Sequence, residues 1–318
     1  MSMISSDAAS VRVKAVDALL SGLVDYAGLF PPASQGMREA LENYASYREG
    51  EDRSALGRFI VPVSRLKELE TVGRDLLPRG PGSEPWRLSV LVSGDIRAAS
   101  DEMRDFNSRH SAGSPDGHAM IDVVELKAST VDEIDDQRSE IPRTFTPYFE
   151  IPTKGDVGRL VRKIAMVGAR AKVRTGGVTP DSIPPASDVI GFIAACRREA
   201  VPFKATAGLH HPIRGPYRLT YAPDSPVGTM YGFLNVFVAS AFVNEGESED
   251  VAVAALEESD PHAFVFEDDA IVWRGKRLAS REIEQSRRML AISFGSCSFR
   301  EPVDELAPLV HSTFPDGQ

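Results

Sequence analysis

The chain contains little cysteine: Cys196 and Cys297 are the only two in 318 residues. Two cysteines so far apart exclude a disulfide framework and also a zinc site of the usual paired spacing. Such sparse use of cysteine is typical of proteins in a reducing compartment, and we expect a cytoplasmic location.

Positive charge and long apolar runs are scarce as well. The 36 Lys and Arg residues are outnumbered by 46 Asp and Glu, which leaves a net charge of −10. We therefore expect neither a nucleic acid nor an anionic membrane as partner. No window reaches about 18 consecutive apolar residues, and the N-terminus lacks a signal-peptide core, so we expect a soluble, unexported protein. A small molecule is the expected partner, and a homo-oligomer is left open.

Short apolar runs alternate with longer amphipathic stretches along the chain. An N-terminal helix over 10–21 is followed by a short strand near 22–27, and seven further runs predict buried strands: Arg58–Val63, Arg87–Val92, Met120–Leu126, Phe145–Glu150, Ala169–Arg174, Pro202–Thr206 and Ala263–Phe266. Helical patterns lie between them, at 36–48, 64–77, 95–109, 130–138, 155–167, 186–200, 228–244 and 281–292. This alternation predicts the α/β class, and eight strand–helix units predict a (β/α)8 TIM barrel over about residues 22–295.

We expect residues 1–318 to form a single barrel domain with additions. Residues 209–262 are too long for a simple loop, contain helical patterns at 228–244 and 248–258, and predict an elaborated helix with a lid-like insertion. After the last predicted strand, Glu267–Asp269 predicts a hairpin turn. Residues 300–318 are interpreted as a C-terminal tail.

Charged residues interrupt three neighbouring predicted strands. Side chains alternate along a barrel strand between the interior and the helix layer, so the apolar neighbours of each charge assign its direction. This parity turns inward, toward one space, the following polar residues: Thr146, Tyr148, Glu150, Lys172, Arg174, Lys204 and Thr206. Buried charges are costly, and these cations outnumber the local carboxylate. Because active sites of this fold lie at the carboxyl ends of the strands, a functional mouth is favoured over a purely structural network.

Two inward lysines on adjacent strands have a specific chemical use. An ordinary lysine, with a pKa of about 10.4, is protonated at neutral pH and cannot attack a carbonyl group. A second ammonium group nearby disfavours that protonation, as Schiff-base enzymes require. Arg174 could act in the same way or bind a carboxylate or phosphate of the substrate. Asp25, a carboxylate within an apolar run, needs a partner, and an inward lysine is the expected one.

These residues carry a family resemblance. Lys172-Val-Arg-Thr-Gly-Gly177 followed by Phe203-Lys-Ala-Thr-Ala-Gly-Leu209 resembles the paired K-x-x-T-G and K-x-x-G-G strands of the deoxyribose-phosphate aldolases, class I aldolases with a TIM barrel. The segments 22–33, 121–124 and 148–151 resemble further motifs of that family in the same order. The resemblance implies that Lys172 forms the Schiff base, that Lys204 lowers its pKa and relays protons, and that Asp122 transfers protons through water. It also places Asp25 at the aspartate of the family's opening motif.

Departures from the family pattern indicate a different substrate. Thr146 and Arg174 replace a lysine and a serine of that pattern. The acidic turn Glu267–Asp269, after the predicted eighth strand, would repel a phosphate. We therefore expect a small, polar, unphosphorylated carbonyl compound, with a carboxylate as the group that Arg174 binds.

Further candidate residues follow from weaker sequence patterns. His210 and His211 are candidates for substrate contact, and Gly176 and Gly177 for an anion-binding turn before a helix, with a plain tight turn as the alternative. The segment 294–299 is unusual in composition; its Cys297 is interpreted as a small buried residue, with a reactive thiol as the alternative.

The leading hypothesis is an enzyme, a Schiff-base-forming lyase or aldolase that needs no cofactor and no metal. The second is a metal-dependent isomerase or epimerase that uses Glu125, Glu150 and His210 or His211. The third is a non-catalytic barrel that binds an anion through the same lysines.

Overall fold

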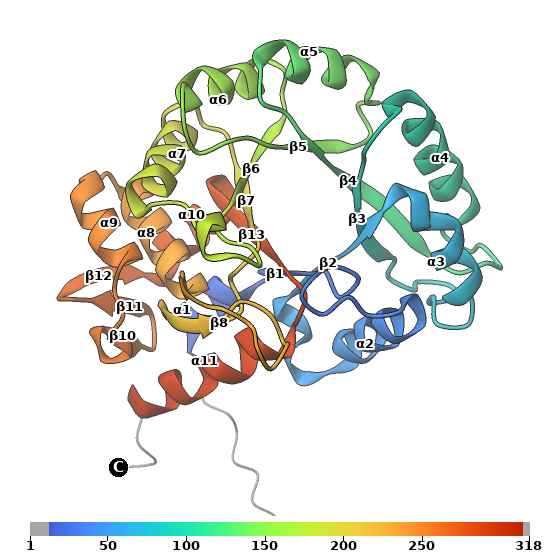
Figure 1. Ribbon diagram of the computed structural model, residues 1–318. Helices are drawn as coiled ribbons and strands as arrows, with labels where there is room; N and C mark the ends of the chain where they lie inside the picture. The colour runs from blue at the N-terminus through green and yellow to red at the C-terminus, as the bar shows by residue number, and fades with distance from the viewer. Residues whose placement is uncertain (1–12, 314–318) are drawn as a thin grey trace, which may run out of the picture.

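The computed structural model describes residues 13–313 and shows a closed barrel of eight parallel strands (Figure 1). The hydrogen-bonded order around the barrel is β1-β13-β7-β6-β5-β4-β3-β2. The chain therefore has the predicted (β/α)8 TIM-barrel fold. Its strands are β1 (Val24–Tyr26), β2 (Leu56–Pro62), β3 (Trp86–Leu91), β4 (Ala119–Lys127), β5 (Thr146–Glu150), β6 (Arg170–Arg174), β7 (Phe203–Thr206) and β13 (Ala291–Ser296).

Helices surround the barrel as a ring (Figure 1), and buried apolar side chains fill the layer between them and the strands. They are α1 (Lys14–Leu20), α2 (Met37–Glu49), α3 (Leu66–Val72), α4 (Ile96–Arg109), α5 (Val131–Glu140), α6 (Val157–Met166), α7 (Ala186–Arg198), α8 (Phe233–Glu245) and α10 (Ser280–Met289). Short 3-10 turns occur at η1 (Glu51–Ala55), η2 (Val63–Arg65), η3 (Pro180–Ser182) and η4 (Pro261–Ala263). No helix in the described residues is long and apolar enough to cross a membrane.

The eighth barrel strand is not the predicted one. The run Ala263–Phe266 falls in η4 and β10 (Phe264–Glu267), which pairs antiparallel with β11 (Ala270–Trp273) and then β12 (Lys276–Ala279) in a separate sheet. Phe264 and Phe266 are buried while Val265 is 41% exposed, an alternation typical of a sheet with one solvated face. The barrel is closed instead by β13, which begins in the last two residues of the predicted helix 281–292 and continues beyond its end.

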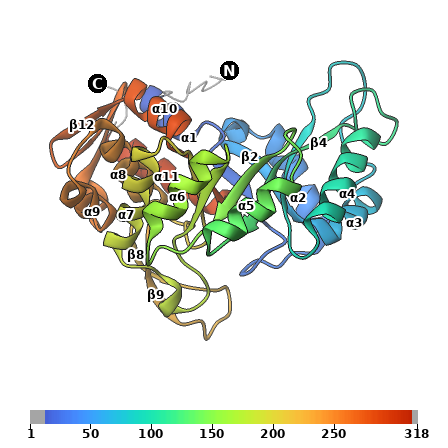
Figure 2. The ribbon, with the colours of Figure 1, turned by 90° about the horizontal axis from the view of Figure 1, so that it is seen from above.

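The predicted insertion 209–262 divides into two parts. The antiparallel hairpin of β8 (Gly215–Arg218) and β9 (Val227–Met230) projects from the barrel body (Figure 2). Helices α8 and α9 (Glu249–Leu256) belong to the outer helix layer, and twelve of the thirteen residues of α8 are buried.

The two ends of the chain differ from the sequence prediction. The first helix begins at Lys14, and residues 10–12 of its predicted range lie outside the described residues. The expected C-terminal tail contains a helix, α11 (Arg300–Thr313), while 314–318 lie outside the described residues.

A β-bulge in β4 determines which of its carboxylates face the interior. Leu88 pairs with Ile121, but the next residue of β3, Ser89, pairs with Val123, so Asp122 is the extra residue. Strict alternation would turn Asp122 and Glu125 to opposite sides. The bulge lets both enter polar contacts inside the barrel, as described below.

Gly57 on β2 packs closely against Asp25, so a substitution there tests the packing of the strands around this carboxylate. A Cβ at Gly57 would lie 2.3 Å from Oδ1 of Asp25 and 3.2 Å from the Val24 carbonyl oxygen. We expect Gly57→Ala to lower the free energy of unfolding by about 1–3 kcal/mol, measured by urea denaturation, because the added methyl group overpacks the site.

Gly191→Ala is the matched control. Gly191 lies within α7, and a Cβ there would meet nothing within 4 Å. The free energy of unfolding of this variant should rise by about 0.4–1 kcal/mol, since alanine restricts the unfolded chain more than glycine does. Equal effects of the two substitutions would contradict the packing described for Asp25.

Candidate active site

Two lysines lie side by side inside the barrel, as strand parity predicted. Lys172 on β6 pairs in register with Lys204 on β7, and their residues are only 4% and 1% exposed. Glu125 of β4 lies between their ammonium groups: its Oε2 is 2.8 Å from Nζ of Lys172 and its Oε1 is 2.6 Å from Nζ of Lys204. One buried carboxylate therefore joins both lysines.

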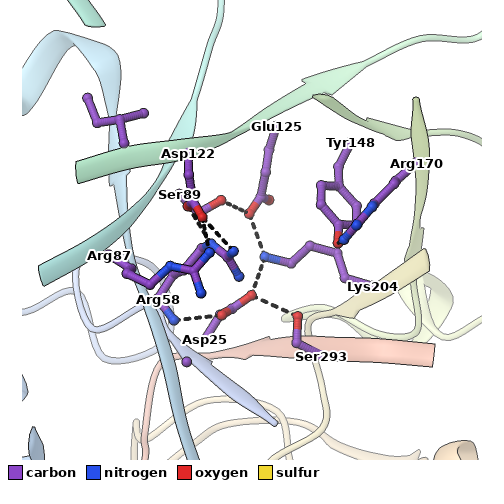
Figure 3. A network of polar contacts seen from close by, with 12 residues as sticks. Asp25, Arg58, Arg87, Ser89, Asp122, Glu125, Tyr148, Arg170, Lys204 and Ser293 are labelled. Carbon is purple, nitrogen blue, oxygen red and sulfur yellow. Dashed lines mark hydrogen bonds and ion pairs between the residues drawn. The ribbon is translucent and has the colours of Figure 1, made fainter. Parts of the chain in front are cut away.

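Asp25 has the lysine partner that the sequence predicted. Its Oδ2 lies 2.6 Å from Nζ of Lys204 and accepts a hydrogen bond of 2.9 Å from the Ser293 hydroxyl (Figure 3). The backbone N–H of Arg58 donates to its other oxygen at 2.7 Å. This carboxylate is thus fixed from β1, β2 and β13, and it holds Lys204 at the centre of the barrel.

Glu150, at the end of β5, contacts the cations nearest the mouth. Its Oε2 lies 2.9 Å from Nζ of Lys172, and its Oε1 accepts a hydrogen bond of 3.1 Å from Nε of Arg174. Three cations, Lys172, Lys204 and Arg174, therefore meet three carboxylates. The prediction that cations outnumber carboxylates here is wrong. It considered only three neighbouring strands, whereas Asp25 and Glu125 come from β1 and β4.

The pKa values of the buried groups follow from these contacts. Burial acts to raise the pKa of Glu125, but Lys172 and Lys204 hold it well below its ordinary value. Burial acts to lower the pKa of Lys204, but Asp25 and Glu125 raise it above the ordinary lysine value. Glu125 is therefore an anion and Lys204 a cation at neutral pH.

A cavity of about 440 Å³ opens onto this cluster. Glu125, Glu150 and Lys172 line its polar wall, together with Lys127 and Gln137. Apolar residues, among them Phe30, Leu91 and Ile96, line the rest. Lys127 and Glu150 are the last residues of β4 and β5, so the cavity lies at the carboxyl ends of the strands, where active sites of this fold occur. Lys172 lines the cavity, whereas Lys204 is not among its lining residues.

Asp122 lies apart from the two lysines. Arg58 holds it with two hydrogen bonds, of 2.7 and 2.8 Å, and Arg87 adds an ion pair (Figure 3). Burial acts to raise the pKa of Asp122, but these arginines lower it. The structure therefore brings Glu125, not Asp122, into contact with the lysines. Sequence reasoning named Glu125 only as a metal ligand; recognising the bulge would have placed it inside.

Three predicted residues lie at the carboxyl ends of β6 and β7: Thr206 is the last residue of β7, and Gly176 and Gly177 lie in the loop after β6. The backbone carbonyl of Thr206 accepts hydrogen bonds from the backbone and side chain of Thr175. A Cβ on Gly176 would lie 3.2 Å from Cα of Gly208, so the two loops pack closely here. Gly177 does not lead into a helix, since α7 begins at Ala186. The 3-10 turn η3 follows instead, so no α-helix begins directly after Gly177, and anion binding at this turn stays a prediction.

His210 and His211 contact the C-terminal helix. Nδ1 of His210 lies 2.9 Å from Glu301, and Nδ1 of His211 lies 2.7 Å from Glu305. Within residues 13–313 no three His, Cys, Asp or Glu side chains are grouped as metal ligands would be. The two histidines and the carboxylates Glu125 and Glu150 thus have different partners.

Comparison with known proteins adds no family assignment. No protein-family model matches the chain, and no curated protein shows a similar sequence. The resemblance to the deoxyribose-phosphate aldolases therefore depends on the motifs quoted above.

The stability of this cluster should depend on pH. Burial acts to raise the pKa of Glu150, but Lys172 and Arg174 lower it below its ordinary value. Its contribution to stability is therefore present above its unfolded pKa, about 4.3, and is lost as the pH falls through its folded pKa. We expect Glu150→Gln to lower the free energy of unfolding by about 1.5–3 kcal/mol at neutral pH, measured by urea denaturation. The difference in this free energy between wild type and variant should become smaller as the pH falls from about 5 to about 3.

Glu267→Gln removes an exposed carboxylate that pairs with Arg277 and serves as the control. Exposed pairs contribute about 0–1 kcal/mol, so this variant should stay close to wild type at every pH. If the difference in free energy of unfolding between wild type and Glu150→Gln does not change with pH, the ion pairs of Glu150 contribute little to stability.

Proposed function

We propose that this protein is a Schiff-base-forming lyase or aldolase that acts on a small, polar, carboxylated carbonyl compound. The observation that carries the proposal is the position of Lys172. Lys172 lines the cavity, and its amine has two carboxylates within 2.9 Å. A nucleophile with adjacent proton acceptors in a pocket at the carboxyl ends of the strands is the arrangement that amine catalysis requires.

Glu150 supplies the proton transfers in this proposal. It touches Lys172 and lines the cavity, and it is more exposed than Glu125, whose Oε1 is already shared by Lys204 and Ser89. The ammonium of Lys172 passes a proton to Glu150, and the free amine attacks the carbonyl carbon to give a carbinolamine. Protonated Glu150 returns the proton to the departing hydroxyl, so that water leaves and an iminium ion forms. The bond between the α and β carbons then breaks: the β-hydroxyl gives its proton to Glu150, the β carbon leaves as a carbonyl product, and the electron pair forms an enamine on Lys172. Glu150 returns that proton to the α carbon, and water hydrolyses the resulting iminium ion, which releases the second product and the free lysine.

Lys204 acts through Glu125 in this scheme. It is cationic and has no place on the cavity wall, but Glu125 bridges it to Lys172. Lys204 therefore holds the Glu125 carboxylate in position, and that carboxylate orients the Lys172 amine. The chain of contacts from Asp25 through Lys204 and Glu125 to Lys172 also offers the proton relay that the family resemblance implies.

Cations at the mouth favour an anionic substrate. Lys127 lines the cavity and is exposed. Arg174 is not a lining residue, but it is exposed beside Glu150, which does line the cavity. It uses Nε for Glu150 and makes no hydrogen bond from its two terminal nitrogens within the described residues. A planar guanidinium group suits a carboxylate. The acidic turn Glu267–Asp269 no longer argues against phosphate, because it belongs to the β10–β11 hairpin and Asp268 pairs with Lys14.

Reductive trapping tests the proposal. Wild-type protein is incubated with a panel of small aldehydes and ketones and sodium borohydride, then analysed by intact mass and peptide mapping. We expect one stable adduct on the peptide that contains Lys172. Lys172→Arg keeps the charge but cannot form the adduct, whereas Lys276→Arg, which alters an exposed pair with Glu247, should still be modified. Trapping of no carbonyl compound at Lys172 would favour a non-catalytic, anion-binding barrel.

Arg174→Lys tests the carboxylate preference. The variant keeps the positive charge and loses the planar pair of donors, so the apparent affinity for pyruvate should fall by about 1–3 kcal/mol, or roughly 5- to 150-fold. The affinity for diacetyl, in which a methyl ketone replaces the carboxylate, should hardly change. Both are measured from the concentration dependence of trapping.

Arg162→Lys, at an exposed arginine of α6, is the control and should leave both affinities unchanged. If Arg174→Lys weakened pyruvate and diacetyl equally, the arginine would have no role in recognising the carboxylate.

A further inference from the structure

A second group of reactive side chains lies beyond the end of β13. Cys297 follows this strand directly, and its Sγ lies 3.9 Å from Nε2 of His210. Nδ1 of the same imidazole is 2.9 Å from Glu301 on α11. The hydroxyl of Tyr221 donates to Glu301 at 3.0 Å and lies 3.8 Å from Sγ. No member of this group contacts the two lysines, and no step of the proposed Schiff-base chemistry uses it.

Cys297, His210 and Glu301 are arranged as nucleophile, base and carboxylate, in the way that activates a thiol. When Nδ1 of His210 donates its proton to Glu301, Nε2 is the nitrogen with a free lone pair, and it faces the thiol. His210 can therefore take the proton of Cys297, and Glu301 then stabilises the imidazolium ion. Cys297 also lies just before the N-terminus of the fourteen-residue helix α11, where the partial positive charge of the helix favours a thiolate.

The surrounding charges support the charged form of His210. Burial acts to lower its pKa, but the contacts with Cys297 and Glu301 raise it to about 9. Burial likewise acts to raise the pKa of Glu301, and His210 and Tyr221 lower it. The other titratable groups nearby are His211, its partner Glu305, and Tyr26.

We propose that Cys297 is a thiolate nucleophile activated by His210 and Glu301, and that it is a site of oxidation by hydrogen peroxide. The thiol proton moves to Nε2 of His210, and the sulfur attacks one peroxide oxygen. The O–O bond breaks, the departing hydroxide takes the proton from His210, and the products are one cysteine sulfenic acid and one water. Sulfur is oxidised by two electrons and peroxide is reduced by two.

The burial and the charged surroundings of Cys297 limit which oxidants can reach its sulfur. The residue is 5% exposed, so only a small molecule can reach the sulfur. Glu301 and Glu305 give the approach a negative charge that disfavours anionic thiols and disulfides. Hydrogen peroxide is small and uncharged, and it needs the proton donor that His210 provides.

Peroxide treatment followed by trapping with dimedone, a reagent specific for sulfenic acids, tests the proposal on the full chain. Peptide mapping should show dimedone on Cys297 at least tenfold faster than on Cys196. Cys196 is fully buried in α7, and burial raises the pKa of its thiol, so it serves as an internal reference. His210→Gln should slow the labelling of Cys297 by tenfold or more, and Cys297→Ser should abolish it.

His211→Gln is the matched control, since His211 pairs with Glu305 in the same way but has no contact with Cys297. Its labelling rate should stay within threefold of wild type. Equal slowing by His210→Gln and His211→Gln would show that both histidines only anchor α11, and labelling of Cys297 no faster than of Cys196 would show that the thiol is inert. Either result would overturn the proposal.

Alkylation with iodoacetamide separates activation from mere exposure. Between about pH 8.5 and pH 6.5 the rate for an ordinary thiol falls roughly 50-fold, because the thiolate disappears. At Cys297 the fall should be less than threefold in wild type and should return to the ordinary dependence in His210→Gln. An ordinary dependence in wild type would contradict the thiolate. These readouts do not use Lys172, so they stand or fall apart from the Schiff-base proposal.

Discussion

The interior of this barrel depends on the carboxylate of Glu125. Two ammonium groups on adjacent strands repel each other, and each would lose several kcal/mol of hydration on burial without a partner. Glu125 lies 2.8 Å from one and 2.6 Å from the other, and Asp25 and Glu150 supply the remaining negative charge. Removal of any one of these groups would leave an uncompensated charge among residues that are almost fully enclosed. The charges of the cluster therefore depend on one another, and of its two lysines only Lys172 lines the cavity.

The bulge at Asp122 lets β4 supply one carboxylate to each of two groups of cations, which meet where the backbone N–H of Arg58 donates to Asp25. Asp122 binds Arg58 and Arg87, which lie near the amino-terminal ends of β2 and β3 (Figure 3). Glu125, three residues further along β4, binds the two lysines. Without the extra residue, one of these carboxylates would turn into the apolar helix layer. A local irregularity in one strand thus lets both carboxylates of β4 form ion pairs with buried or half-buried cations.

Much of the fold could be predicted because buried parallel strands and amphipathic helices leave strong periodic patterns. The inward direction of Lys172, Lys204 and Glu150 followed from strand parity alone, and so did the need of Asp25 for a lysine. The eighth strand was missed because Ser293, Gly295 and Ser296 give β13 a weak strand pattern, while Phe264 and Phe266 give β10 a strong one. The contact of Glu125 with the lysines was missed because a bulge has no clear sequence signal. The grouping of His210, Cys297 and Glu301 depends on a helix that the sequence did not indicate.

The central claim is that Lys172 is the reactive amine and that Glu125 and Lys204 keep it in place. A crystal structure of the protein after reduction with borohydride in the presence of a trapped carbonyl compound tests this claim most directly. The account predicts continuous density from Nζ of Lys172 into the cavity beside Glu150, with Glu125 still bridging toward Lys204. Density on Lys127 or another exposed lysine, with Lys172 unmodified in its ion pairs, would contradict it.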